Sequence, residues 1–370
     1  VEKLNSERAY PFTVISQKGN REVSIENVRA VDGTQMELVS DEISDADLMA
    51  TAVGVNVLPR IVGPLVEGLK KRWNKGNFEP LNIIICENRL DANKYLAELI
   101  RKELTEAEIG YFEKTVGLVE ASIGRMVPVM TAEMQQGNIL RVCVEEYCEL
   151  PVDRDAFKGH IPSIKNLKPF SPFEFFIQRK LFIHNLGHAI TAYLGYLKGY
   201  THIWEAIGDP FIKEVALRAM QESASALSKE HGVPLKELME HVENLIHRFG
   251  NHQLGDTIER VGKDTLRKLS PNDRLVGAAK LCEKKGINPM HIVVGIAAAL
   301  KFQGKDDESS QSILDTIETR GVEYVLETVC GLSVDSDLFG QVLLSYNQPG
   351  GQVSWLKESV NTPSDRNIFK

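Results

Sequence analysis

Residues 180–200 read KLFIHNLGHAITAYLGYLKGY, and this stretch predicts an amphipathic, aromatic-rich helix. At about 100° per residue, an α-helix brings four of its polar side chains to one side. These are Lys180, His184, Asn185 and His188. Apolar side chains cover much of the remaining surface, so the polar edge is what distinguishes this helix from an ordinary core helix.

The four polar groups suit the removal of a proton from an alcohol. A lysine at the edge of an apolar helix loses hydration, so we expect its pKa to fall toward the range of a general base. Asparagine can donate to an oxygen that becomes negative, and histidine can orient a hydroxyl. Two alternatives stay open: ordinary solvent-facing polar residues, and a metal site. His184 and His188 are four apart like two zinc ligands, but the glutamate of H-E-x-x-H and an obvious third ligand are missing.

Gly187 lies inside the same predicted helix. Glycine in a helix interior costs about 1 kcal/mol relative to alanine. We therefore expect another backbone or a ligand to approach closely beside His188.

Outward from this helix the chain shows two regimes. From about Ser171 apolar residues recur at three and four, which predicts helices almost throughout. Before Pro169, short apolar strands alternate with helices, which predicts a parallel α/β domain whose ligands lie beyond the carboxyl ends of its strands. The predicted strands are 21–31, 46–53, 81–88 and 139–147, with helices at 58–73 and 91–104 between them. The predicted helices of the second regime are 171–198, 202–231, 234–249, 271–285, 288–302, 308–319 and 334–346.

Length and composition agree with this division. A chain of 370 residues suits two domains, here an α/β domain over 1–169 and a helical domain over 170–350, followed by a loop-like tail at 351–370. The net charge of -8 argues against a nucleic-acid or anionic-membrane surface. No apolar run is long enough to span a bilayer, and the first residues do not form a signal peptide. Five cysteines without zinc-type spacing favour reduced thiols in a cytoplasmic protein.

Lys180, Asn185 and His188 match K-x4-N-x2-H, and in this the chain resembles the polyol-specific long-chain dehydrogenases. The resemblance extends in order through nearly the whole chain. Its other blocks are TAVG (51–54), PLNIIICEN (80–88), ERVGKDTLRKLSPNDRL (259–275) and GIAAALKF (295–302).

The resemblance implies oxidation of a secondary alcohol to a ketone, with NAD taking the hydride and no metal required. The blocks are most similar to members that interconvert mannitol 1-phosphate and fructose 6-phosphate. The same chemistry on an unphosphorylated polyol or sugar acid is one alternative. A non-catalytic relic is the other. A monomer is the default expectation.

The family also implies roles for single residues. Lys180 corresponds to the general base, which becomes the general acid in the reverse direction. Asn185 and Asn88 correspond to donors that hold the reacting oxygen, which together resemble an oxyanion hole. Spacing alone does not separate His184 from His188; the resemblance favours His188 as the group that orients the substrate. By residue type alone, Asn88 could instead form a strand-end turn or an N-cap.

Four basic residues gather in block 259–275. The resemblance matches Arg260 and Lys268 to substrate-contacting positions, and Arg267 and Arg274 lie near them in the sequence. Arginine suits bidentate contact with a phosphate, so we expect a phosphate clamp here. Acidic residues in the same block leave a solvated face with local ion pairs as the alternative.

Residues 50–54 resemble the strand end that runs along the dinucleotide, with Thr51, Val53 and Gly54 as the candidates for contact; a simple turn is the alternative. However, no two glycines in the chain are two positions apart, so the G-x-G fingerprint is absent. We therefore expect the first strand, its glycine turn and the acidic ribose ligand to be missing, and NAD binding by this chain to be weak.

A second departure from the family lies at 122–128. Gly124 stands where the family more often has aspartate, while Arg125 is retained. That aspartate lies near the substrate pocket of the family, so the departure bears on the preference for a particular polyol.

Overall fold

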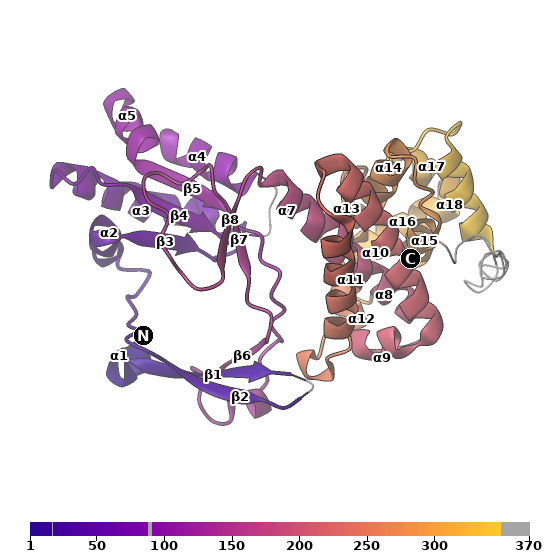
Figure 1. The fold of residues 1–370 in the computed structure, drawn as a ribbon, viewed down its shortest axis with the longest axis horizontal. Helices are drawn as coiled ribbons and strands as arrows, with labels where there is room; N and C mark the ends of the chain where they lie inside the picture. Colours follow the sequence, from indigo (N-terminus) through magenta and orange to yellow (C-terminus); the bar gives the residue numbers. More distant parts are fainter. Residues whose placement is uncertain (17, 88–90, 349–370) are drawn as a thin grey trace. The chain divides into compact units, whose positions relative to one another are not determined.

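The computed structural model describes residues 1–16, 18–87 and 91–348 (Figure 1). By contacts within the chain, it divides into two compact units, Val1–Ile177 and Gln178–Lys370, and each is considered by itself. The tail expected at 351–370 lies outside the described residues.

Within its described residues, the first unit contains three sheets, with strand orders β2-β1-β6, β3-β4-β5 and β7-β8. The β3-β4-β5 sheet is parallel throughout, which confirms the predicted α/β character. The β1–β2 pair is antiparallel and was not predicted. The strands are β1 Ala9–Ile15, β2 Arg21–Glu26, β3 Leu48–Thr51, β4 Leu81–Ile85, β5 Val116–Glu120, β6 Val142–Glu145, β7 Leu150–Asp153 and β8 Leu167–Phe170.

Helices accompany these strands (Figure 1). The predicted helices 58–73 and 91–104 are confirmed as α3 and α4, the second of them shorter than expected. Helix α5 begins with a capping box between Thr105 and Glu108, in which each side chain accepts from the other residue's backbone N–H. The helices are α1 Glu2–Glu7, α2 Met36–Asp45, α3 Leu58–Asn74, α4 Ala92–Arg101, α5 Glu106–Thr115, α6 Ala132–Gln135 and α7 Glu174–Arg179.

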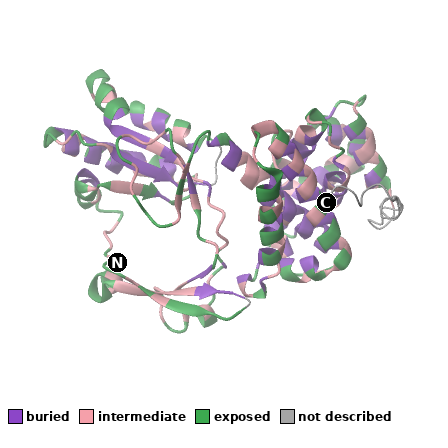
Figure 2. Ribbon diagram, in the orientation of Figure 1, coloured by how far each residue is buried: buried purple, intermediate pink, exposed green. Residues whose placement is uncertain are grey.

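Strand β4 is buried on both faces and packs against apolar side chains on each side. Ile83 and Ile85 pack into a core formed with α2, α3, α4 and α5. Ile84 points the other way and packs with Val119 and Val152. Every residue of β4 is buried, whereas β3 beside it is mainly intermediate in exposure (Figure 2). An apolar run buried on both faces is characteristic of a central parallel strand, and it leaves the polar residues that follow β4 at the carboxyl edge.

The second unit is helical throughout its described residues, as predicted. Three short helices were not predicted, namely α12, α13 and α17, and the helix predicted over 202–231 is divided at Asp209 into α9 and α10. The helices are α8 Leu186–Leu197, α9 Ile203–Gly208, α10 Pro210–His231, α11 Leu235–Phe249, α12 Ile258–Gly262, α13 Thr265–Lys268, α14 Val276–Lys284, α15 Met290–Ala299, α16 Glu308–Arg320, α17 Val322–Thr328 and α18 Asp337–Asn347, together with the 3₁₀ turn η2 His252–Leu254. Among the described residues, no helix is both long and apolar enough to cross a membrane.

The helix predicted over 171–198 is confirmed as an unbroken helical run over 174–197, but its hydrogen bonding is not α-helical throughout. A π-helical segment, η1 Lys180–Asn185, separates α7 from α8. Hydrogen bonds in a π-helix run from i to i+5, so each turn is wider than in an α-helix. The angular positions calculated at 100° per residue therefore do not apply between Lys180 and Asn185.

Helix α8 packs closely against its neighbours. A Cβ placed on Gly187 would lie 2.3 Å from Sδ of Met220 in α10, and one on Gly195 would lie 2.6 Å from Ile258. A close approach at Gly187 is thus found, but it is made by the side chain of Met220 and not by the backbone or ligand that was expected. The tight packing fixes the start of α8, where the predicted site lies.

Candidate active site

Lys180 opens the π-helical segment and Asn185 closes it. Burial, together with the positive charge of Arg274, lowers the pKa of Lys180 to about 8. This confirms the fall in pKa predicted from the sequence. Single π-turns within α-helices occur frequently at functional sites, and this one carries the first and last polar residues of the K-x4-N motif.

His188 faces a buried carboxylate. Its Nε2 lies 3.4 Å from Oδ2 of Asp256, and its ring stacks on Phe249 with centroids 5.0 Å apart and planes 11° from parallel. Burial lowers the pKa of His188, while the nearby negative charge of Asp256 partly opposes that shift. The imidazole is therefore predominantly neutral at pH 7.

Asp256 also contacts a cation, because Oδ1 accepts from the guanidinium of Arg260. Burial raises the pKa of Asp256, but the nearby His188 ring and the charge and hydrogen bond of Arg260 outweigh burial and leave that pKa below its usual value. Asp256 was not among the residues predicted from the sequence. Its position just before a helix cap gave no signal of a contact with α8.

His184 is buried beside these groups, 6.2 Å from His188 between ring centroids. Burial and the nearby charge of Arg248 lower its pKa well below the usual value. It is therefore a neutral core imidazole. Across the described ranges, no group of three or more histidine, cysteine or acidic side chains is arranged to hold a metal ion.

The basic residues of 260–274 each have a local partner. Lys268 is buried, and its ammonium donates to the backbone carbonyls of Val261 and Lys263. Burial and the charges of Arg274 and Arg267 lower the pKa of Lys268 to about 7.

The two arginines that follow form ion pairs within the same segment. Arg267 contacts Asp264 and lies 3.0 Å from Asp273, and Arg274 contacts Asp273 at 2.8 Å. Arg267 keeps about half of its side chain exposed, at 48%, while Arg274 keeps only 12%. The structure thus brings these cations together but balances them with the acidic residues of the same block.

In the first unit, β3 ends at Thr51, which pairs with Ile85 of β4. The Glu87 carboxylate accepts from the backbone N–H groups of Val53 at 3.0 Å and Gly54 at 2.9 Å. Gly54 has φ of 89°, which glycine adopts without strain. Glu87 was missed from the sequence, although an acid directly after a buried strand was an available signal. Asn88 lies outside the described residues.

Arg125 bonds the segment around Gly124, the position at which the family more often has aspartate, to the backbone of Glu145. Its guanidinium donates to the Glu145 carbonyl at 3.0 and 2.8 Å and lies 5.3 Å from the Phe12 ring centroid. A Cβ on Gly124 would lie 3.3 Å from the Tyr147 ring. Arg125 therefore serves to hold the backbone here.

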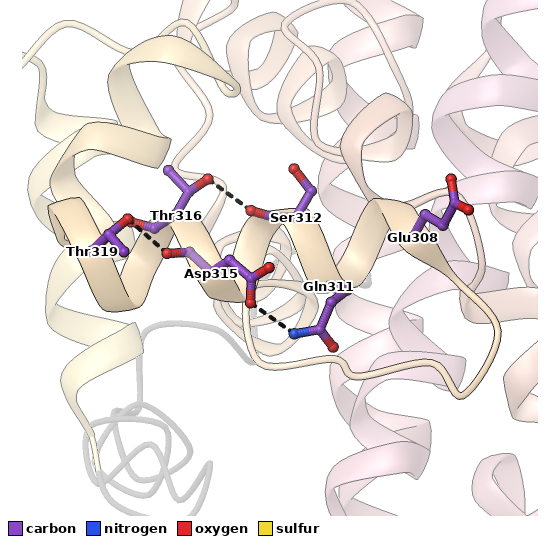
Figure 3. Close-up of a pocket in the computed structure, with 6 residues that line it drawn as sticks. All are labelled: Glu308, Gln311, Ser312, Asp315, Thr316 and Thr319. Atoms are coloured by element: carbon purple, nitrogen blue, oxygen red, sulfur yellow. Dashed lines mark hydrogen bonds between the residues drawn. The ribbon is translucent and has the colours of Figure 1, made fainter.

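A surface hollow of about 400 Å³ lies elsewhere, along one side of α16 (Figure 3). None of the predicted site residues lines it. Its polar side chains bond along their own helix, as in the 2.8 Å hydrogen bond from Gln311 to Asp315. We assign it no function.

The first unit is built around a parallel sheet, and the second is helical. The second unit carries a lysine of lowered pKa in a K-x4-N-x2-H segment. This arrangement is that of a two-domain dehydrogenase. Residues 1–166 match the model of the mannitol dehydrogenase Rossmann domain, and residues 173–330 match the mannitol dehydrogenase C-terminal domain. The chain belongs to the mannitol dehydrogenase family, which confirms the resemblance inferred from its motifs.

Curated relatives match over most of their length. The chain is 36% identical to the mannitol-1-phosphate 5-dehydrogenase of Thermoanaerobacter pseudethanolicus, covering 94% of this chain and 88% of the relative. It is 37% identical to the enzyme of the same name from Bacillus licheniformis, and the match covers 93% of this chain and 89% of that relative.

Two solved structures share the fold. The first is a substrate-free D-sorbitol dehydrogenase, with a TM-score of 0.76 over 93% of this chain and 82% of that chain. The second is a Pseudomonas fluorescens mannitol 2-dehydrogenase in complex with NAD and D-mannitol, with a TM-score of 0.73 over 98% of this chain and 85% of that chain. At 15% identity each supports the fold alone.

Proposed function

We propose that this chain is an NAD-dependent oxidoreductase that interconverts mannitol 1-phosphate and fructose 6-phosphate. The observation that carries the proposal is Lys180, a lysine with a pKa near 8 in the K-x4-N-x2-H segment of a chain whose curated relatives bear the name mannitol-1-phosphate 5-dehydrogenase. A lysine with an ordinary pKa would stay protonated at neutral pH and could not accept a proton.

In alcohol oxidation, neutral Lys180 takes the proton of the reacting hydroxyl. Asn185 donates to the oxygen as negative charge develops on it, and Asn88 is the second donor that the family implies. In ketone reduction, the Lys180 ammonium returns the proton to that oxygen. His188 orients a substrate hydroxyl from its place on Phe249.

The end of strand β3 suits a dinucleotide. Oγ1 of Thr51 is buried without a hydrogen-bond partner in the part of the chain that the structure describes, so its bonding capacity is unused at this strand end. Glu87 holds the backbone of Val53 and Gly54, and apart from the adjoining residues no atom of the described chain lies within 4 Å of where a Gly54 Cβ would be. These residues would hold NAD, which when bound accepts the hydride from the carbinol carbon.

Arg260 and Arg267 are the cations that a substrate phosphate would meet, because about half of each side chain is exposed, at 50% and 48%. Lys268 and Arg274 are more buried, and they would add to the positive potential without leaving their partners. Arginine binds phosphate through two parallel hydrogen bonds, which suits both of these exposed arginines to the role.

NADH consumption with fructose 6-phosphate and with fructose tests the proposal. We expect a higher kcat/KM for the phosphate ester, and a fall in kcat of about 10²-fold or more in Lys180→Ala, the usual contribution of general acid–base catalysis. Lys198→Ala removes an exposed lysine near the end of the same helix and serves as the control.

Two results would contradict separate parts of the proposal. A folded Lys180→Ala protein with near-normal kcat would exclude Lys180 as the acid and base. Equal kcat/KM values for fructose and its phosphate would exclude a phosphate clamp and favour an unphosphorylated polyol.

A further inference from the structure

Asp256 lies between two of the groups proposed to contact the substrate. One carboxylate oxygen faces Nε2 of His188 at 3.4 Å, and the other accepts from the Arg260 guanidinium. The residue itself is buried, with 7% of its surface exposed. A buried carboxylate is tolerated when cations and hydrogen bonds compensate its charge, and Arg260 supplies both.

The backbone around Asp256 is fixed independently of these contacts. Its carbonyl accepts from the Ile203 N–H at 2.9 Å, and the next residue, Thr257, caps α12 by accepting from the Arg260 N–H at 3.2 Å. Thr257 also forms a β-bridge with His202. The carboxylate is therefore held in place by the fold and does not depend on a substrate for its position.

This placement determines which nitrogen of His188 carries the proton. A neutral imidazole has one N–H donor and one acceptor nitrogen, and an ionised carboxylate can only accept. Nε2 is buried and makes no hydrogen bond to any described residue in this structure. The Asp256 carboxylate, 3.4 Å away, is an acceptor that its N–H can reach. The separation is longer than the usual range of about 2.7–3.2 Å, and such contacts often tighten when substrate binds.

We infer that Asp256 is a positioning residue of the alcohol site: its carboxylate keeps the proton of His188 on Nε2, so that Nδ1 accepts a hydrogen bond from a substrate hydroxyl. The inference deepens the proposed function and, for the role of Nδ1, rests on it. Stacking on Phe249 fixes the plane of the ring, and Asp256 fixes its tautomer. The same carboxylate holds Arg260, so one residue aligns a hydroxyl acceptor and a cation.

The tautomer can be measured without substrate by nitrogen-15 NMR of the full chain with labelled histidine, assigning His188 from a His188→Gln sample. We expect the Nε2–H form in the wild type. In Asp256→Asn the amide can donate as well as accept, so we expect a mixture of tautomers. Arg260→Gln keeps the carboxylate and should keep the Nε2–H form.

Kinetics provide the second measurement. Asp256→Asn should raise the KM for fructose 6-phosphate by about tenfold or more while kcat changes less, since one good hydrogen bond to a substrate hydroxyl is lost. An Nδ1–H tautomer in the wild type would overturn the inference, even if Asp256→Asn did not fold. An unchanged tautomer together with an unchanged KM in Asp256→Asn would also overturn it.

A failure of the proposed function would be seen separately. If the wild type consumed no NADH with any ketose phosphate, the tautomer measurement would still decide what Asp256 does to His188. The two conclusions can therefore fail independently.

Discussion

Two lysines of the second unit show that a lowered pKa does not by itself identify a base. Burial is the main cause for both, and it brings the pKa of Lys180 to about 8 and that of Lys268 to about 7. Lys268 donates to two backbone carbonyls, so its ammonium form is held where it is. Lys180 belongs to a π-turn with Asn185, which suits transfer of a proton.

Arg274 provides a test of how the pKa of Lys180 is set. Oxidation needs neutral Lys180, so kcat/KM for the alcohol should rise with pH through about 8. Arg274→Gln removes a positive charge that disfavours the ammonium, so the pKa of Lys180 should rise and the acid limb of the profile should move to higher pH.

Arg267→Gln is the matched control for that profile. Arg267 acts on the pKa of Lys268 but is not among the causes of the shift at Lys180, so its loss should leave the acid limb in place. An acid limb that stays where it is in Arg274→Gln would show that the charge of Arg274 does not control the base.

The residue types of the site could be predicted from the sequence only where a motif carried them. K-x4-N-x2-H indicated Lys180, Asn185 and His188, and burial of the lysine followed from its apolar helix. Asp256 and Glu87 act across the fold, on α8 and on the turn after β3, and no local pattern encodes such contacts. The partners of these acids become visible only once the chain is folded.

At the scale of elements, the apolar repeat of the sequence predicted the long helices, but it did not predict where the backbone departs from regular geometry. The long helices α3, α10 and α11 show repeating apolar positions and were predicted. Strands β1, β5, β7 and β8 were missed. Three of them, β1, β7 and β8, contain a proline, which argues against a strand in a sequence pattern; β5 contains none. The π-turn was missed because an α-helical repeat assumes i to i+4 bonding throughout.

Two glycine substitutions test the packing of α8. A Cβ at Gly187 would meet buried Met220, so Gly187→Ala should destabilise the protein by about 1–3 kcal/mol through overpacking. Gly340 lies inside α18 with open space around its missing Cβ, so Gly340→Ala should stabilise by up to about 1 kcal/mol. Urea denaturation measures both changes.

A double variant shows whether the contact itself is responsible. In Gly187→Ala/Met220→Ala the new methyl group fills part of the space that Met220 leaves, so the combined cost should be smaller than the sum of the two single costs. If the two costs simply add, Met220 is not what restricts position 187.

At the scale of the whole molecule, the net charge of -8 conceals a concentration of buried and half-buried basic groups in the second unit. Burial lowers the pKa of His184, His188 and His241 as well as those of the two lysines. The neutral forms of these groups are favoured by folding, while the unfolded chain binds protons at ordinary pKa values. Acid should therefore weaken this unit through its histidines as well as through protonation of paired carboxylates.

His241 allows that effect to be measured. Burial and the charges of Arg179 and Arg248 lower its pKa from 6.5 to about 3, so between those values the unfolded state binds a proton that the folded state does not. The free energy of unfolding is therefore unaffected by His241 well above pH 6.5. It falls as the pH drops below about 6.5, because protonation then favours the unfolded state. Between pH 7 and pH 5 the loss should be about 2 kcal/mol.

Urea denaturation of the wild type and His241→Gln at the two pH values isolates this contribution, because other titrating groups are common to both proteins. The difference in free energy of unfolding should shift by about 2 kcal/mol in favour of the glutamine variant at pH 5. His247→Gln, an exposed position on the same helix, controls for the loss of an imidazole. A difference that stays constant with pH would mean that His241 accepts its proton as readily in the folded protein as in the unfolded chain.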